Sequence, residues 1–384
     1  MKKFAAILLA LVLALGCLTG CGSKKGDTVM SVDGTDVSFD EFMYYLKTSA
    51  TTLTKYYQSS TGGGVDWDGV CIYDKTKTNA EWCVNEALYN AAQACVIMSK
   101  GKSMNCLPTD EQLKTLEDNI SAIRKNYEDQ DDPDAAFTAA LNDQGFTLDS
   151  FKTVNKVNFT LSNIFASLYG ENGEKVSDEI LKGYIDKNGF MTSAHILFKT
   201  TEEVKGEDGQ TTEKDISDSA KAEKKAKAEK LAKELKAIKD DEKRKEKFLE
   251  YMKKDSEDPG KESYPNGYCF TDGAMVQEYT DATKALKDYE VSDVVESKFG
   301  YHIIMRLPTT ASDVDINNQY GYTLGQMAAS YDFDEEMKKW KVSDKAEFNS
   351  QYKDFDFTRF FGDAGFTYTT YAAYSACLLY TSPS

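Results

Sequence analysis

The hydrophobic pattern of this 384-residue chain changes near residue 191, and the change constrains the fold more than any other feature. Before it, apolar residues recur at intervals of three and four, as on helices with one buried face. After it, short β-like apolar runs alternate with helical segments. The length suits two or three domains, so we expect an α+β protein with a mostly helical region followed by a small α+β domain.

The region 28–190 is predicted to be helical after one β-hairpin. An Asp-Gly pair at 33–34 lies between two short apolar runs, which is a signal for a two-residue hairpin turn. Ser38 with Glu41 has capping-box spacing, and Val37 and Phe42 are spaced as a hydrophobic staple. Further helices are expected at 80–98, from the Thr109–Gln112 capping box to about 127, and at 135–142, 148–168 and 177–187.

The region 191–307 is predicted to be a separate domain with the order β-α-α-β-α-β-β. A polar, acidic stretch at 201–216 is interpreted as a loop. The segment 308–376, with a helix near 334–340, is expected to pack on the helical region. Strands are expected at 193–198, 268–270, 291–295 and 301–307, and helices at 217–239, around 248–252 and at 275–286.

The amino terminus has the features of an export signal. A basic start, Met1–Lys3, precedes an apolar run over 4–15 that is too short to span about 30 Å of hydrocarbon. Leu-Thr-Gly before Cys21 resembles a bacterial lipobox, which implies a diacylglycerol on the Cys21 sulfur. Two or three acyl chains on this one residue would satisfy the two-signal requirement for stable anchoring to a membrane. We therefore expect a signal peptide over 1–20 and a lipidated tether over 21–27. An ordinary secretory leader and a cut before Cys17 are the alternatives.

Charge and cysteine content exclude several classes of protein. The chain has 63 acidic and 46 basic residues, a net charge of −17, so nucleic acid is not an expected partner. Six cysteines follow Cys21, and none of them forms a CxxC pair, which argues against a zinc ribbon or a thioredoxin-type motif. The four cysteines between 71 and 106 could form one disulfide or could be buried free thiols, and the sequence does not decide between these alternatives.

The only two histidines fall near the centres of two predicted strands. His195 stands in Ala-His-Ile-Leu, and His302 stands in Gly-Tyr-His-Ile-Ile. Two strands of one small sheet can place both rings on the same face. Two histidines leave few ways to build a His-rich metal centre or a Ser-His-Asp triad. A structural role for each ring and a metal site with Asp258 are the competing interpretations.

At this point the sequence resembles the parvulin family of peptidyl-prolyl isomerases over roughly 115 residues. Five separated motifs occur in family order. They are Ala-His-Ile-Leu (194–197), Ser-Glu-Asp-Pro-Gly (256–260), Phe-Thr-Asp-Gly-Ala-Met (270–275), Glu-Val-Ser (290–292) and Phe-Gly-Tyr-His-Ile-Ile (299–304). With the lipobox and the helical region ahead of it, the whole chain is similar to PrsA-type foldase lipoproteins, whose front half is SurA-like.

The resemblance implies a small α+β domain with a four-stranded sheet and an isomerase site that needs no cofactor and no metal. Taken one by one, the hydrophobic candidates are more typical of a core than of a pocket, and Asp258 before Pro-Gly is typical of a turn. The segment 264–269 departs from the family pattern and lacks the leucine that often lines the slot. The implied catalytic residues are His195, Asp258, Ser297 and His302, and the implied proline slot consists of Phe270, Met275 and Tyr279.

The sequence therefore predicts a membrane-anchored, extracytoplasmic bacterial foldase that binds unfolded exported polypeptides and isomerises their X–Pro bonds. A non-catalytic holdase with a degenerate parvulin domain is the alternative, and the altered segment 264–269 favours it. A solute-binding lipoprotein would share the lipobox but not the parvulin motifs. The last residues, 377–384, resemble a translated sequencing adapter and are excluded from fold reasoning. Oligomeric state is left open.

Overall fold

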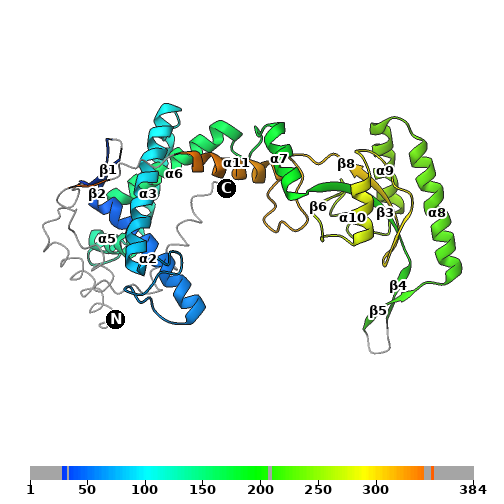
Figure 1. Cartoon of the computed structure of the whole chain (residues 1–384), viewed down its shortest axis with the longest axis horizontal. Coiled ribbons are helices and arrows are strands. Elements are labelled where there is room, and N and C mark those ends of the chain that lie inside the picture. Colours follow the sequence, from blue (N-terminus) through cyan, green and yellow to red (C-terminus); the bar gives the residue numbers. More distant parts are fainter. Residues whose placement is uncertain (1–27, 33, 206–209, 341–346, 350–384) are drawn as a thin grey trace. The chain divides into compact units, whose positions relative to one another are not determined.

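The computed structural model describes residues 28–32, 34–205, 210–340 and 347–349 (Figure 1). The predicted signal peptide, Cys21, the tether and the 377–384 tail lie outside these residues. The chain forms two compact units, residues 1–167 with 338–384, and residues 168–337. Within the described ranges, no helix has the length and apolarity needed to cross a membrane.

The first unit begins with the predicted hairpin. Strands β1 (Thr28–Val32) and β2 (Thr35–Ser38) pair antiparallel with Val32 opposite Thr35, so the predicted pairing of the two strands is confirmed. A short strand, β9 (Glu347–Phe348), pairs with β1 on its other side. The carboxy-terminal part of the chain thus returns to the first strand of the unit.

Helix starts in this unit follow the capping chemistry. Ser38 Oγ accepts a hydrogen bond from the Glu41 backbone N–H at 3.2 Å, and the Thr109–Gln112 box has both reciprocal bonds. Thr78 with Glu81 forms another full box that was not predicted. The core lies between the first two helices and β1. The helices are α2 (Phe39–Thr61), α3 (Asn79–Ser103), α4 (Asp110–Lys125), α5 (Pro133–Asp143) and α6 (Leu148–Tyr169).

The cysteines of the described chain are buried. Cys71, Cys83 and Cys106 are free thiols, as is Cys269. Because three of the four cysteines between 71 and 106 are free, no disulfide joins two of these four, and the free-thiol alternative holds. Burial raises the pKa of the Cys83 thiol, so this side chain behaves as a small apolar residue.

The second unit contains the predicted four-stranded sheet in the antiparallel order β6-β3-β8-β7. Its central strands carry alternating side chains, so each face buries its own set of residues. Ala194, Ile196 and Ile303 pack against one layer of helices, and Ile304 packs on the opposite side. Figure 1 shows the strands and helices of this unit. The strands are β3 (Met191–Lys199), β6 (Tyr268–Phe270), β7 (Val295–Ser297) and β8 (Gly300–Leu307). The layer contains α8 (Asp218–Ala237) and α9 (Asp241–Asp255), and α10 (Gln277–Ala285) lies on the other face.

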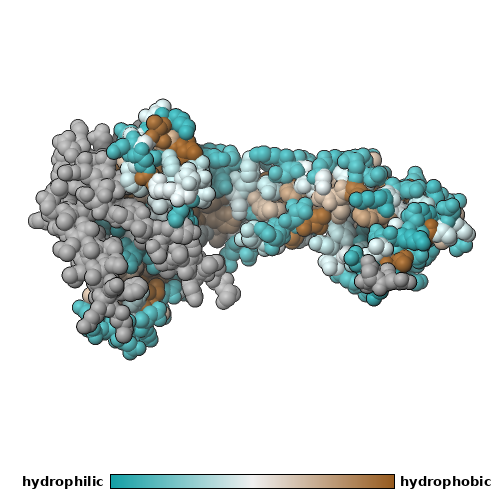
Figure 2. Space-filling model, turned by 90° about the horizontal axis from the view of Figure 1, so that it is seen from below, coloured by the Kyte–Doolittle hydropathy of each residue, from teal (hydrophilic) through white to brown (hydrophobic). Residues whose placement is uncertain are grey.

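The stretch 201–216 is not a loop, and that prediction is wrong. It contains a two-stranded hairpin, β4 (Thr201–Lys205) with β5 (Thr211–Asp215). Threonine and valine favour strands, and Glu202 stands opposite Lys214. Nearly all residues of both strands are exposed, so no alternation of hydrophobicity marked the pair. In the space-filling view most of the visible surface around this part of the chain is hydrophilic (Figure 2).

Two other boundaries differ from the prediction. The expected strand at 291–295 is reduced to one bridge between Val291 and Met305, and β7 begins at Val295. The helix expected at 334–340 is α11 (Leu324–Lys339). It begins ten residues earlier because Thr323 and Gln326 exchange capping hydrogen bonds. The remaining helix is α7 (Asp178–Asn188).

The residues that follow β8 lie against the sheet of the second unit. Asp313 Oδ2 accepts a hydrogen bond from Thr192 Oγ1 at 2.8 Å, and Ile316 N–H donates to the Cys269 carbonyl at 2.9 Å. Within α11, Asp332 Oδ2 accepts from the Tyr169 hydroxyl at 2.7 Å. The domain limits drawn from the sequence stay a prediction.

Gly300 opens β8 in a conformation that other residues avoid, which gives a first test. Its φ is +135°, and a Cβ there would lie 2.1 Å from the Phe198 carbonyl oxygen. We expect Gly300→Ala to destabilise the second unit by more than about 2 kcal/mol, because strain and a backbone clash add. Urea unfolding followed by circular dichroism measures the change.

The matched control is Gly183→Ala in α7, where a Cβ meets nothing within 4 Å. Alanine is the better helix former, so this variant is expected to gain about 0.5–1 kcal/mol. Equal stability of the two variants would contradict the assignment of Gly300 as the strained position.

Candidate functional site

The two histidines meet on one face of the sheet because of the register between β3 and β8. His195 stands opposite Ile304, and Leu197 stands opposite His302, so the histidines are diagonal neighbours on the same face. Their Nδ1 atoms are 3.0 Å apart, and their rings are nearly parallel, with centroids 5.2 Å apart. The exposed fractions of His195 and His302 are 7% and 3%. The pair is therefore a buried hydrogen bond between strands.

The pair belongs to a longer chain of hydrogen bonds. Ser297 Oγ is 2.7 Å from His302 Nε2, and His195 Nε2 is 3.1 Å from Asp258 Oδ2. With both rings neutral, a single direction satisfies every atom. Ser297 donates to His302, the Nδ1–H of His302 donates to His195, and the Nε2–H of His195 donates to Asp258. All four predicted catalytic side chains thus lie in one hydrogen-bonded row, and their catalytic roles stay a prediction.

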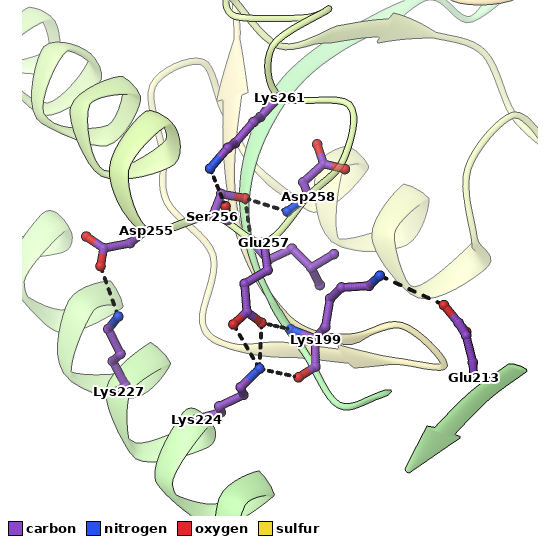
Figure 3. A network of polar contacts seen from close by, with 10 residues as sticks. Lys199, Glu213, Lys224, Lys227, Asp255, Ser256, Glu257, Asp258 and Lys261 are labelled. Atoms are coloured by element: carbon purple, nitrogen blue, oxygen red, sulfur yellow. Dashed lines mark hydrogen bonds and ion pairs between the residues drawn. The ribbon is translucent and has the colours of Figure 1, made fainter. Parts of the chain in front are cut away.

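The loop that carries Asp258 is fastened to the end of β3 (Figure 3). Ser256 Oγ accepts from the Leu197 backbone N–H at 3.0 Å, and the Glu257 N–H donates to the Leu197 carbonyl at 2.8 Å. The Glu257 carboxylate accepts from the Lys199 N–H and from Lys224 Nζ, both at 2.6 Å. One backbone bond and three bonds to side chains thus hold this loop against the end of β3, so the position of Asp258 follows from the position of β3.

Burial and hydrogen bonding fix the charges of the site. Burial and the neighbouring His195 lower the pKa of His302 to about 3, so this ring is neutral at ordinary pH. Burial raises the pKa of Asp258, but hydrogen bonds from His195 and Tyr268 outweigh it and bring the value to about 2. The row therefore ends in a permanent carboxylate at Asp258, and its His302 ring is uncharged at ordinary pH.

Aromatic side chains surround the histidines. The Tyr279 ring stands edge-on to both imidazoles, and its hydroxyl is 2.8 Å from Ser193 Oγ. Of the three predicted slot residues, Phe270 and Tyr279 have exposed fractions of 0% and 2%, whereas Met275 is half-buried beside them. The proline slot stays a prediction, and Met275 is the member with accessible surface.

Three site residues escaped the sequence reasoning. The Tyr268 hydroxyl donates a hydrogen bond to Asp258 Oδ2 at 2.5 Å, and Ser193 contacts Tyr279. Ser256 accepts a hydrogen bond from Leu197 and so holds the start of the Asp258 loop against β3. Tyr268 lies in the segment that departs from the family pattern, and that departure was the available signal. Ser256 opens the Ser-Glu-Asp-Pro-Gly motif, which was its signal, whereas Ser193 carried none, because a small hydroxyl side chain is common in strands.

The depressed pKa of His302 predicts a pH dependence of stability. Between the ordinary histidine value of 6.5 and about 3, the unfolded chain binds a proton that the folded chain does not. The contribution of His302 is therefore fully present above pH 6.5 and falls with decreasing pH, by up to about 1.4 kcal/mol per pH unit. We expect His302→Gln to cost more unfolding free energy at pH 7 than at pH 4.5.

Urea titrations of the full chain and this variant at both pH values measure the difference. Titratable groups that do not contact His302 contribute equally to the unfolding free energy of the two proteins, so their contributions cancel in the comparison. A cost that is the same at pH 7 and pH 4.5 would show that His302 is not held neutral in the folded protein.

Known proteins that this chain is similar to include peptidyl-prolyl isomerase domains and foldases. Residues 195–307 match the family model for the rotamase, or PPIC-type PPIase, domain. The chain is 24% identical over 252 residues to the foldase protein PrsA of Clostridium perfringens, covering 61% of this chain and 63% of the relative. It is 32% identical over 194 residues to PrsA of Staphylococcus aureus, covering 50% of this chain and 51% of the relative.

Among solved structures, one of the SurA-like chaperones PEB4 and Cj1289 of Campylobacter jejuni matches with 20% identity and a TM-score of 0.24, covering 82% of this chain and 93% of that one. The chain spans about half to three fifths of the length of the curated relatives. The matched residues contain the whole row from His195 to His302. Residues 195–307 therefore belong to the PPIC-type peptidyl-prolyl isomerase family.

Proposed function

We propose that the chain is an extracytoplasmic foldase that binds unfolded exported polypeptides and catalyses cis/trans isomerisation of their X–Pro bonds. The observation that carries the proposal is the buried His195–His302 hydrogen bond inside a domain of the PPIC-type family. Burying a hydrogen-bonded polar pair costs desolvation free energy that an apolar pair does not cost. Its presence inside a small sheet therefore favours a functional role for the pair.

The reaction sets simple requirements for the site. The barrier of about 18–20 kcal/mol comes from the loss of amide resonance on twisting, and no covalent bond breaks. The site must bind the twisted amide better than either planar isomer. A planar amide carries more negative charge on its oxygen than a twisted one. A fixed carboxylate near that oxygen, which Asp258 supplies, therefore disfavours the planar form and lowers the barrier.

The other three residues of the hydrogen-bonded row support Asp258. His195 donates a hydrogen bond to the Asp258 carboxylate and holds it in place. His302 orients His195, and Ser297 donates a hydrogen bond to the acceptor nitrogen of His302. None of these roles requires a proton transfer, in accord with a reaction in which no proton is transferred. Met275 would contact the proline ring, and the buried Phe270 and Tyr279 would support it from below.

An isomerase assay on the full chain tests this assignment. We expect acceleration of cis/trans exchange in an Ala-Pro peptide. We expect Met275→Ala to lower kcat/KM about tenfold, because about 1.4 kcal/mol of contact with the proline ring is lost. Val204→Ala on the exposed β4 is the matched control and should leave the rate unchanged. Acceleration by wild type that Met275→Ala leaves intact would remove Met275 from the slot.

The holdase is the second candidate, and the burial of Phe270 and Tyr279 favours it. The same preparation distinguishes the two functions. Suppressed aggregation of an unfolded client without acceleration of exchange supports the holdase. Acceleration that disappears in His302→Gln supports the isomerase.

We also propose that the mature chain begins at a lipidated Cys21 on the outer face of a bacterial membrane. The support is the Leu-Thr-Gly-Cys sequence after a short apolar run. In cells fed a labelled fatty acid, wild type should carry label and sediment with membranes. Cys21→Ser should lose both properties, because one apolar leader without acyl chains gives no lasting anchor.

Cys17→Ser is the matched control, since Cys17 belongs to the leader. It should keep the label and the membrane fraction. Labelled Cys21→Ser together with unlabelled Cys17→Ser would move the lipid to Cys17.

A further inference from the structure

A tyrosine of the segment that departs from the family pattern reaches into the row of hydrogen bonds. Tyr268 begins β6, where it stands opposite Ser193 of β3 and faces the same side of the sheet as His195. Its hydroxyl donates to Asp258 Oδ2 at 2.5 Å, and its ring stands edge-on to the His195 ring, with centroids 5.6 Å apart. The side chain is buried, so this contact is part of the packed interior.

The turn after Asp258 leaves room for this hydroxyl. A Cβ on Gly260 would lie 2.1 Å from the Tyr268 oxygen, so any larger residue there would displace the tyrosine. Tyr264 packs against the Tyr268 ring with centroids 4.6 Å apart and holds it from the other side. The tyrosine thus occupies a space shaped by its neighbours.

The carboxylate of Asp258 is held by three donors. Oδ2 accepts from both the Tyr268 hydroxyl and His195 Nε2–H, and Oδ1 accepts from the Gly260 N–H at 3.2 Å. Two donors on Oδ2 fix the rotation of the carboxylate and point that oxygen at His195. The Tyr268 bond also lowers the pKa of Asp258, as a donor to the charged form should.

We propose that Tyr268 is a positioning residue of this site, whose hydroxyl sets the orientation of the Asp258 carboxylate and, through it, the hydrogen bond of His195. The proposal rests on the proposed isomerase function for its effect on rate. Its effect on His195 does not depend on activity.

Tyr268→Phe removes the hydroxyl and keeps the ring, and Tyr264→Phe is the matched control on the adjacent ring. The chain contains only two histidines, so ¹⁵N-histidine labelling of the full chain gives four ring nitrogens to follow by NMR. We expect the His195 Nε2 resonance to shift in Tyr268→Phe and to stay in place in Tyr264→Phe. We expect kcat/KM to fall about three- to tenfold in the first variant and to stay unchanged in the second.

Each outcome has one interpretation. A purely structural tyrosine would lower the unfolding midpoint of Tyr268→Phe without moving the His195 nitrogen signal, and that result overturns the proposal. A shifted signal with unchanged kcat/KM in an active protein also overturns it. If wild type has no isomerase activity, the proposed function fails, and the His195 signal alone then decides whether Tyr268 orients the row.

Discussion

The hydrogen bond between His195 and His302 depends on the register of β3 and β8, and the site depends on that bond. A shift of one residue in either strand would move a ring to the opposite face, among Ala194, Ile196 and Ile303. The apolar residues that face α8 and α9 therefore do more than form a core. They fix which side of each strand packs against α8 and α9 and so bring the two polar rings together on the side that α10 covers.

The same strand also positions the acidic end of the site. The backbone of Leu197 pairs with Ser256 and Glu257, two residues before β3 leaves the sheet. Asp258 follows directly, so the hydrogen bonds that join its loop to Leu197 limit its distance from His195. Tyr268 and Gly260 then complete the support of the carboxylate that makes the 3.1 Å contact.

The sequence predicted those parts of the structure that have a local signal. The pairing of β1 with β2, the Thr109 capping box and the strands around His195 and His302 follow from residue type and spacing, and the structure has them. The β4–β5 hairpin was missed because neither face is buried, so its side chains show no period. The Tyr268–Asp258 bond was missed because it joins residues ten positions apart through a turn whose shape no pattern specifies. Motif resemblance brought the four catalytic candidates together, but geometry was needed to order them into one directed row.

The neutral state of His302 has a consequence for tolerance to acid. In the folded domain neither that ring nor the Asp258 carboxylate changes its charge between neutral pH and about pH 4, given pKa values of about 3 and 2. At His302, acidification in this range acts on the unfolded chain, which gains a proton that the folded ring does not accept. A molecule that is still folded therefore keeps these two groups in the charge state that they have at neutral pH.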